Sequence, residues 1–178
     1  MTEIIAPSVL SGFMELLPED QVLFNRIKDT IKEKFELYGF WPLDTPAIEK
    51  SEILFAKGGG ETTKQIYRID KGDSTQDQAL RFDLTVPLAR YVAQHANELS
   101  FPFRRYQIAK VFRGERSQKG RYREFYQCDI DIVGRDKLSL DNDAEIPAVI
   151  FEIFNTLGLS QVMIHMNNRR LLNGYLVH

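Results

Sequence analysis

Two strand-like runs, residues 101–115 and 122–133, flank a short polar loop and constrain the fold more than any other feature. Alternate side chains of a strand point to opposite faces. The even positions of the second run are apolar and predict a buried face: Tyr126, Cys128, Ile130 and Ile132. The odd positions are mostly polar: Arg123, Phe125, Gln127, Asp129 and Asp131. The pattern predicts a long antiparallel hairpin whose polar face meets either water or a ligand.

Basic residues are concentrated in the same region. The chain has a formal net charge of −2, yet eight of its 23 Lys and Arg residues lie between Arg104 and Arg123, against one acid, Glu115. A local cluster in a near-neutral chain indicates a defined anionic ligand more than general coating of nucleic acid. From charge alone, a solvated basic hairpin is an equal alternative.

The remaining sequence alternates between helical and strand-like patterns. Apolar residues at spacings of three and four predict helices over residues 18–38, 86–95 and 141–157, with shorter helices over 51–55 and from 169 onward. Strands are predicted over residues 40–43, 65–69, 79–82 and 161–166. Because Pro42 lacks an N–H, the first of these strands is expected at an edge or an interface, not in the centre of a sheet. Mixed helices and strands without repeats indicate an α+β fold.

A glycine run, residues 57–64, lies beside lysines and invites comparison with a phosphate-binding loop. Its spacing does not match that motif, in which Gly-Lys is followed by Ser or Thr. The segment is therefore interpreted as a loop. Ser51 and Thr85 are expected to cap the helices that follow them.

Other features of the sequence concern the cellular location of the protein. The single cysteine, Cys128, excludes an internal disulfide and fits a reducing compartment. Residues 1–10 show no secretory signal, and no apolar run approaches the ~20 residues that cross a bilayer. A cytoplasmic protein without a membrane segment is expected, and no residue is assigned to a metal site.

Two strings carry a family resemblance. Residues 111–129 read VFRGERSQKGRYREFYQCD, and residues 80–90 read LRFDLTVPLAR. The first resembles motif 2 of class II aminoacyl-tRNA synthetases and is similar to the histidyl-tRNA synthetases in particular. The second resembles the segment with which that family meets the amino group of histidine. The helix over residues 18–38, followed by Asp44-Thr45-Pro46, resembles motif 1, the dimerisation element.

The resemblance implies a class II synthetase-like antiparallel sheet flanked by helices, here incomplete, with residues 1–178 as the N-terminal portion of the catalytic domain. It implies ATP-dependent activation of histidine to histidyl-adenylate and transfer to tRNA(His), with ATP and Mg²⁺ as cofactors, and a homodimer through motif 1. Motif 3, an Arg-Gly-Leu-Asp-Tyr-Tyr-like histidine segment and an anticodon-binding domain are absent from these 178 residues. Little activity is therefore expected of the isolated chain.

The nucleotide site implied by the resemblance consists of four residues of motif 2. Arg113 contacts the α-phosphate of ATP and the histidine carboxylate, and it is the catalytic residue. Glu115 accepts the adenine amino group, Phe125 stacks on adenine, and Arg121 reaches the γ-phosphate. Attack of a carboxylate on a phosphate brings two negative groups together, so the reaction needs fixed positive charge more than a base.

The implied histidine site uses Asp83, Thr85 and Gln127 for the α-amino group, and Asp131 near the imidazole. At positions 83 and 131 many bacterial members carry the longer Glu. A second interpretation is the synthetase-like regulatory subunit of ATP phosphoribosyltransferase, in which motif 2 tends to be degraded. Because Arg113, Glu115, Arg121, Phe125 and Gln127 are all present, the sequence favours the synthetase.

Overall fold

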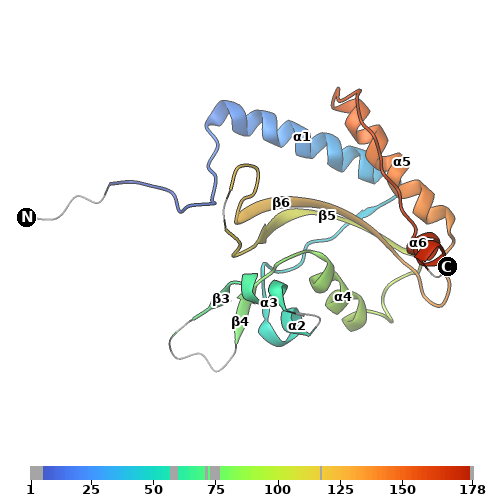
Figure 1. Cartoon of the computed structure of the whole chain (residues 1–178), viewed down its shortest axis with the longest axis horizontal. Helices are drawn as coiled ribbons and strands as arrows, with labels where there is room; N and C mark the ends of the chain where they lie inside the picture. The colour runs from blue at the N-terminus through green and yellow to red at the C-terminus, as the bar shows by residue number, and fades with distance from the viewer. Residues whose placement is uncertain (1–5, 57–59, 71, 73–76, 117, 177–178) are drawn as a thin grey trace, which may run out of the picture. The chain divides into compact units, whose positions relative to one another are not determined.

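The structure is a computed structural model that describes residues 6–56, 60–70, 72, 77–116 and 118–176. The chain divides into two compact units, residues 1–138 and 139–178. The first unit holds two small sheets and four helices among its described residues, and the second holds two helices (Figure 1). The mixed architecture confirms the predicted α+β class.

The predicted hairpin is the centre of the first unit. Strands β5 (Phe103–Phe112) and β6 (Glu124–Val133) pair antiparallel over ten residues each, with Gln107 opposite Asp129. Strand β1 (Trp41–Pro42) pairs in parallel with the other edge of β5, so the sheet has the order β1-β5-β6. The edge position expected for the proline-containing strand is confirmed.

Helix α1 (Pro18–Leu37) lies across the even-numbered face of the hairpin (Figure 1). The ring of Phe35 is 5.6 Å from that of Tyr106, and the Tyr106 hydroxyl donates to Glu36 at 2.8 Å. Burial, with this hydrogen bond, raises the pKa of Tyr106 to about 12. Further along, Phe24 packs against Tyr126 at 5.3 Å. The helix ends before Gly39, whose φ of 75° is favourable for glycine.

A second sheet lies on the other side of the hairpin (Figure 1). Strands β2 (Ile48–Lys50), β4 (Gln78–Leu80) and β3 (Arg68–Ile69) form it, with β4 in the middle. Helices α2 (Ser51–Phe55), α3 (Glu61–Gln65) and α4 (Thr85–Gln94) accompany it. Leu54, Ile66 and Ala79 form a small buried core there. This arrangement brings the segment between β4 and α4 onto the hairpin.

The second unit contains α5 (Asp141–Thr156) and α6 (Arg169–Leu176). Both helices match the predicted segments. The Ser139 hydroxyl accepts the N–H of Asp141 at 3.2 Å and so helps to satisfy the first turn of α5. Val149 and Ile153 are its buried residues.

The predicted burial of the even-numbered face of β6 is wrong at two of its four positions. Tyr126 and Cys128 are exposed, because α1 covers the even-numbered face only in part. The odd-numbered face is the better buried, since Val111 packs with Leu84 and with the partly buried Phe125. Core residues and the polar residues expected to meet a ligand therefore share one face.

Three smaller predictions also differ from the structure. Part of the expected glycine-rich loop is helix α3, while residues 57–59 of that loop lie outside the described residues. Residues 161–166, all described, form no strand, because no neighbouring strand pairs with them in the described chain. Ser51 and Thr85 are the first residues of their helices instead of the caps before them.

The packing of α1 predicts a large difference between two of its residues. Phe35 is 3% exposed and Leu37 is 76% exposed. Phe35→Ala should lower the free energy of unfolding by about 3–5 kcal/mol, because it removes a buried ring that contacts Tyr106. Leu37→Ala, the control, should change it by less than about 0.5 kcal/mol. Urea denaturation at one protein concentration measures both, and equal losses would contradict the packing described.

Candidate active site

The end of the hairpin places the motif-like residues just beyond the two strands. Arg113 N–H donates to the Arg123 carbonyl at 2.8 Å, which continues the ladder by one step past β5. Gln118 and Arg121 bridge to close the turn, and Gly120 there has a φ of 79°, in the region that favours glycine. The strands and the turn together fix where the side chain of Arg113 leaves the sheet.

The guanidinium of Arg113 lies between two aromatic rings. Its carbon is 4.5 Å from the centre of the Phe82 ring and 4.9 Å from that of Phe125. Its Nε also donates to the Phe82 carbonyl at 3.2 Å. No carboxylate among the described residues forms a salt bridge with it. Cation–π contacts and one hydrogen bond therefore hold this cation in place without a direct ion pair.

Gly114 allows helix α3 to approach the hairpin. Its N–H donates to the Gln65 carbonyl at 2.7 Å, and a Cβ added at Gly114 would lie 3.1 Å from that oxygen. A side chain here would push the two segments apart. The glycine of the motif thus brings Gln65, at the end of α3, to the edge of the site.

A pocket of about 450 Å³ opens at this end of the hairpin. Its lining includes all four residues expected to bind the nucleotide: Arg113, Glu115, Arg121 and Phe125. Arg121 Nη1 and Glu115 Oε2 are 3.3 Å apart, so these two side chains pair with each other in this structure. Gln65, Gly120 and Tyr122 complete the lining.

The residues expected to bind histidine are only partly brought together. Asp83 Oδ1 accepts the N–H of Val86 at 2.9 Å, so this carboxylate caps α4. Thr85 is exposed and lines a separate, largely apolar pocket of about 550 Å³ with Val86 and Arg90. The structure therefore keeps Thr85 apart from the pocket that holds Arg113.

Gln127 and Asp131 lie on the odd-numbered face with Phe125, and Asp129 stands between them. Burial raises the pKa of Asp131, against the opposing charge of Arg105. Burial also raises the pKa of Asp129, with Asp131 and Asp83 adding to the shift and Arg105 opposing it. These side chains therefore form one electrostatic group.

Sequence reasoning missed two members of this group, Asp129 and Arg105. Asp129 stood out only as one more polar residue on the odd-numbered face. Arg105 was counted with the basic cluster, and its pairing with Asp131 depends on the register of β5 against β6. No signal in the sequence specifies that register directly.

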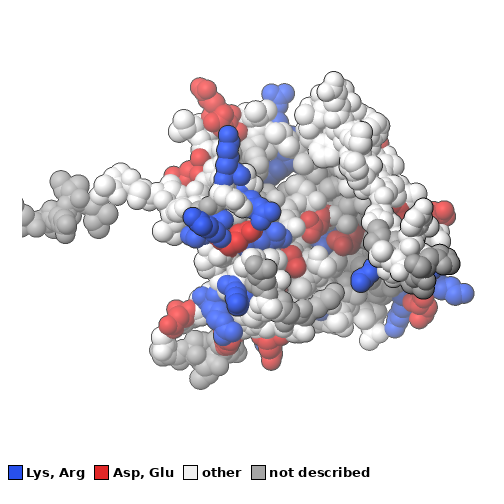
Figure 2. Space-filling model, in the orientation of Figure 1, with Lys and Arg blue, Asp and Glu red and all other residues white. Residues whose placement is uncertain are grey.

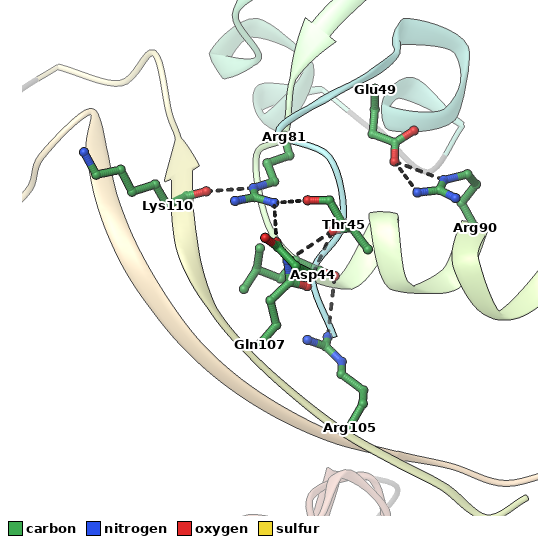
Figure 3. A network of polar contacts seen from close by, with 9 residues as sticks. Asp44, Thr45, Glu49, Arg81, Arg90, Arg105, Gln107 and Lys110 are labelled. Carbon is green, nitrogen blue, oxygen red and sulfur yellow. Dashed lines mark hydrogen bonds and ion pairs between the residues drawn. The ribbon is translucent and has the colours of Figure 1, made fainter. Parts of the chain in front are cut away.

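A network of buried polar contacts joins the chain segments next to the site (Figure 3). Arg81 is 5% exposed; its Nε donates to the Lys110 carbonyl at 2.7 Å and its Nη1 to the Thr45 carbonyl at 2.5 Å. Gln107 donates to Asp44 at 3.0 Å and to the Thr45 hydroxyl at 3.2 Å. The network joins the segment after β1 to β5 and to the residues that precede α4.

The basic cluster is not an open basic surface. Figure 2 shows Lys and Arg side chains beside Asp and Glu side chains over the end of the hairpin. Lys110 pairs with Glu124, and Arg123 donates to the carbonyls of Glu115 and Ser11 at 3.0 and 3.3 Å. Several cations of the cluster therefore already have partners within the chain.

Comparisons with known proteins identify one family by sequence. The family model described as "Histidyl-tRNA synthetase" matches residues 12–177. The chain is 65% identical to the histidine–tRNA ligase of Clostridium tetani over 97% of its own length and 39% of that protein's. The crystal structure of histidyl-tRNA synthetase from Nostoc sp. PCC 7120 superimposes with a TM-score of 0.84 at 48% identity, covering 95% of this chain and 39% of that one.

A structure from Bacillus halodurans described as an ATP phosphoribosyltransferase regulatory subunit/histidyl-tRNA synthetase has a TM-score of 0.75 at 24% identity. At that identity the likeness shows the fold alone. It covers 89% of this chain and 40% of that one. The chain thus spans about two-fifths of the relatives it matches.

The capping role of Asp83 can be tested apart from ligand binding. Asp83→Ala removes the acceptor for the Val86 N–H and should lower the free energy of unfolding by about 0.5–2 kcal/mol. Asp83→Asn keeps an oxygen acceptor of the same length and should lose only a small part of that. Circular dichroism during urea denaturation compares the two, and equal losses would show that the side chain does not cap α4.

Proposed function

The chain belongs to the histidyl-tRNA synthetase family, and we propose that residues 1–178 form the N-terminal portion of the catalytic domain of a histidine–tRNA ligase, with motifs 1 and 2. The proposed reaction is ATP-dependent activation of histidine to histidyl-adenylate, followed by transfer to tRNA(His). The observation that carries the proposal is the position of Arg113. It is a cation held between two rings at the edge of a pocket that also contains Glu115 and Arg121.

Activation joins a carboxylate to the α-phosphate of ATP and releases pyrophosphate. The attack is opposed by repulsion between two anions, so a fixed cation between them lowers the barrier. We assign this role to Arg113, whose planar guanidinium can donate to both groups. Its ring contacts orient it before substrates arrive, and the rate therefore depends little on reorganisation at that residue.

The other nucleotide contacts follow from the same pocket. Phe125 offers an aromatic surface for adenine, and Glu115 can accept the exocyclic amino group. Arg121 would reach the γ-phosphate of a bent ATP. Because Arg121 and Glu115 pair in this structure, ATP binding would exchange that exposed ion pair for contacts with the nucleotide.

For the amino acid, we propose that Asp83 and Gln127 hold the α-amino group and that Asp131 meets the imidazole. Gln127 supports this because its Oε1 is buried and has no hydrogen-bond donor among the described residues. Thr85 is part of the proposal by resemblance only. A bound amino group would have to bring it toward Asp83 from the pocket that it now lines.

ATP is proposed to bind with Mg²⁺. The described residues contain no group of three or more potential metal ligands, so the ion would be held mainly by the phosphates, and we assign no protein residue to it. None of the helices in the described part is long and apolar enough to cross a bilayer. We propose a cytoplasmic location from the family alone.

A homodimer through motif 1 is the proposed assembly. Trp41 is 72% exposed on the edge strand β1, next to the exposed Pro42. Exposed large apolar side chains at a sheet edge are favourable sites for self-association. A two-fold interface there would be self-complementary.

The regulatory-subunit alternative is less well supported. The Bacillus halodurans structure shares the fold, and its description names both activities. A protein that no longer binds ATP would have no use for the ordered cation of Arg113 or for the pocket around it. The intact pocket therefore favours the ligase.

Binding of ATP to the 178-residue chain tests the proposal. Arg113→Ala should weaken ATP binding by about 1.5–3 kcal/mol, or ~10- to 150-fold in Kd, because a charge-assisted contact is lost. Lys119→Ala, which removes the same charge from an exposed position of the hairpin turn, should change the Kd by less than about threefold. Titration calorimetry measures both, after circular dichroism has shown that each variant is folded. Equal losses would refute the assignment of Arg113.

A further inference from the structure

Arg105 is a buried cation to which no role has been assigned so far. It is 0% exposed and stands directly opposite Asp131 across the β5–β6 ladder. Its Nη2 lies 2.6 Å from Asp131 Oδ2 and donates to the Leu84 carbonyl at 3.5 Å (Arg105 is labelled in Figure 3). Burial lowers the pKa of Arg105, while Asp131 and Asp129 oppose the shift. An arginine nevertheless stays charged in proteins.

The contacts of Arg105 are few for a buried arginine. Within the described chain, Nε and Nη1 have no hydrogen-bond acceptor. A buried charge is tolerated when an opposite charge compensates it, and the adjacent carboxylate of Asp131 provides that compensation. The two residues must therefore be considered as one unit.

Arg105 contacts one carboxylate oxygen of Asp131, and the rest of the Asp131 side chain is accessible to solvent. Oδ2, the atom next to Arg105, is fully buried. The side chain as a whole is 32% exposed, so its accessible surface belongs to its other atoms. The 2.6 Å contact is an ion pair by distance, although its angles are not those of a hydrogen bond. The second oxygen remains able to accept a proton donor from a ligand.

We infer that Arg105 is a positioning residue of the histidine site. It holds Oδ2 of Asp131 and keeps that carboxyl ionised, so that the other oxygen accepts an N–H of the substrate imidazole. The inference rests on the proposed function, in which Asp131 meets the imidazole, and adds the residue that gives Asp131 its charge and direction.

The surrounding charges make Arg105 necessary for this role. Asp129 lies two residues before Asp131 on the same strand face, and Asp83 and Arg113 act on Asp129 from the neighbouring segments. Burial already raises the pKa of Asp131, and Arg105 is the cation that opposes the shift. Without it, a buried carboxyl beside a second carboxyl would take up a proton more readily. It would then donate where the site needs an acceptor.

Carboxyl titration of the chain tests the inference. We would label aspartate with ¹³C, assign Asp131 through Asp131→Asn, and follow it by NMR. Arg105→Met should raise the Asp131 midpoint by at least about one pH unit, whereas Arg105→Lys should move it by less than half as much. Arg104→Met is the matched control. The Arg104 guanidinium donates to the Tyr38 carbonyl on the other face of the sheet, so the Asp131 midpoint should not change. An unchanged midpoint in Arg105→Met would overturn the inference.

A binding measurement separates positioning from simple support of the fold. Below the new midpoint, histidine affinity of Arg105→Met should fall at least about tenfold relative to wild type at the same pH, and the ratio of the two should recover as pH rises through that midpoint. A loss that is constant with pH would mean a structural role only and would overturn the inference. If wild-type chain binds no histidine, the proposed function fails, and the carboxyl titration still decides whether Arg105 sets the charge of Asp131.

Arg105→Met also loses stability at neutral pH, because its buried carboxyl has to hold a proton that the unfolded chain releases. The orphaned carboxyl has a folded pKa above its unfolded value, so stability is present at low pH and lost as pH rises through the folded pKa. The variant should therefore regain its fold on acidification, and Arg105→Met/Asp131→Asn should fold at both pH values. A variant that stays unfolded at low pH, and that Asp131→Asn does not rescue, would contradict the pairing.

Discussion

The buried guanidinium of Arg81 is the interaction on which the geometry of the site depends. It donates to carbonyls of the segment after β1 and of β5, and its own backbone pairs with Ala47 on one side and Phe112 on the other. Burial lowers the pKa of Arg81, and the nearby Asp44 partly offsets the effect. Three segments distant in sequence are thereby fixed to one another at a single buried cation.

The position of Arg81 in turn determines where the next two residues, Phe82 and Asp83, lie. Phe82 contributes a ring and a carbonyl to Arg113, and Asp83 caps α4. Both positions follow from the path of the chain after Arg81. The hairpin supplies the other half, since Phe125 and Arg113 meet only because β5 and β6 pair in this register. Preorganised charge of this kind is what phosphate chemistry requires of a protein.

Much of the fold and of the candidate site could be predicted from the sequence, because local patterns specify local elements. The amphipathic stripe of α1, the proline at an edge strand and the long hairpin all appeared as predicted. The family resemblance selected Arg113, Glu115, Arg121 and Phe125, which the structure gathers at one pocket. These residues are close in sequence, so one hairpin is sufficient to bring them together.

The errors concern contacts between distant segments. Alternation along β6 separated two faces correctly but could not say which face the β4–α4 segment would cover. Arg105 and Gln107 are strongly polar, yet both are buried. Arg105 pairs with Asp131 across the ladder, and Gln107 donates to Asp44 in the segment after β1. Thr85 was expected beside Asp83 in the site, and the start of α4 turns it toward another pocket.

The most direct test of the central claim is a crystal structure of the chain with a non-hydrolysable histidyl-adenylate analogue. The account predicts that the adenine ring stacks on Phe125 and that the group replacing the α-phosphate lies within about 3 Å of the Arg113 guanidinium. It also predicts that the pair between Arg121 and Glu115 separates. An analogue bound outside the pocket of Arg113 and Phe125, or bound there with no contact to Arg113, would contradict the account.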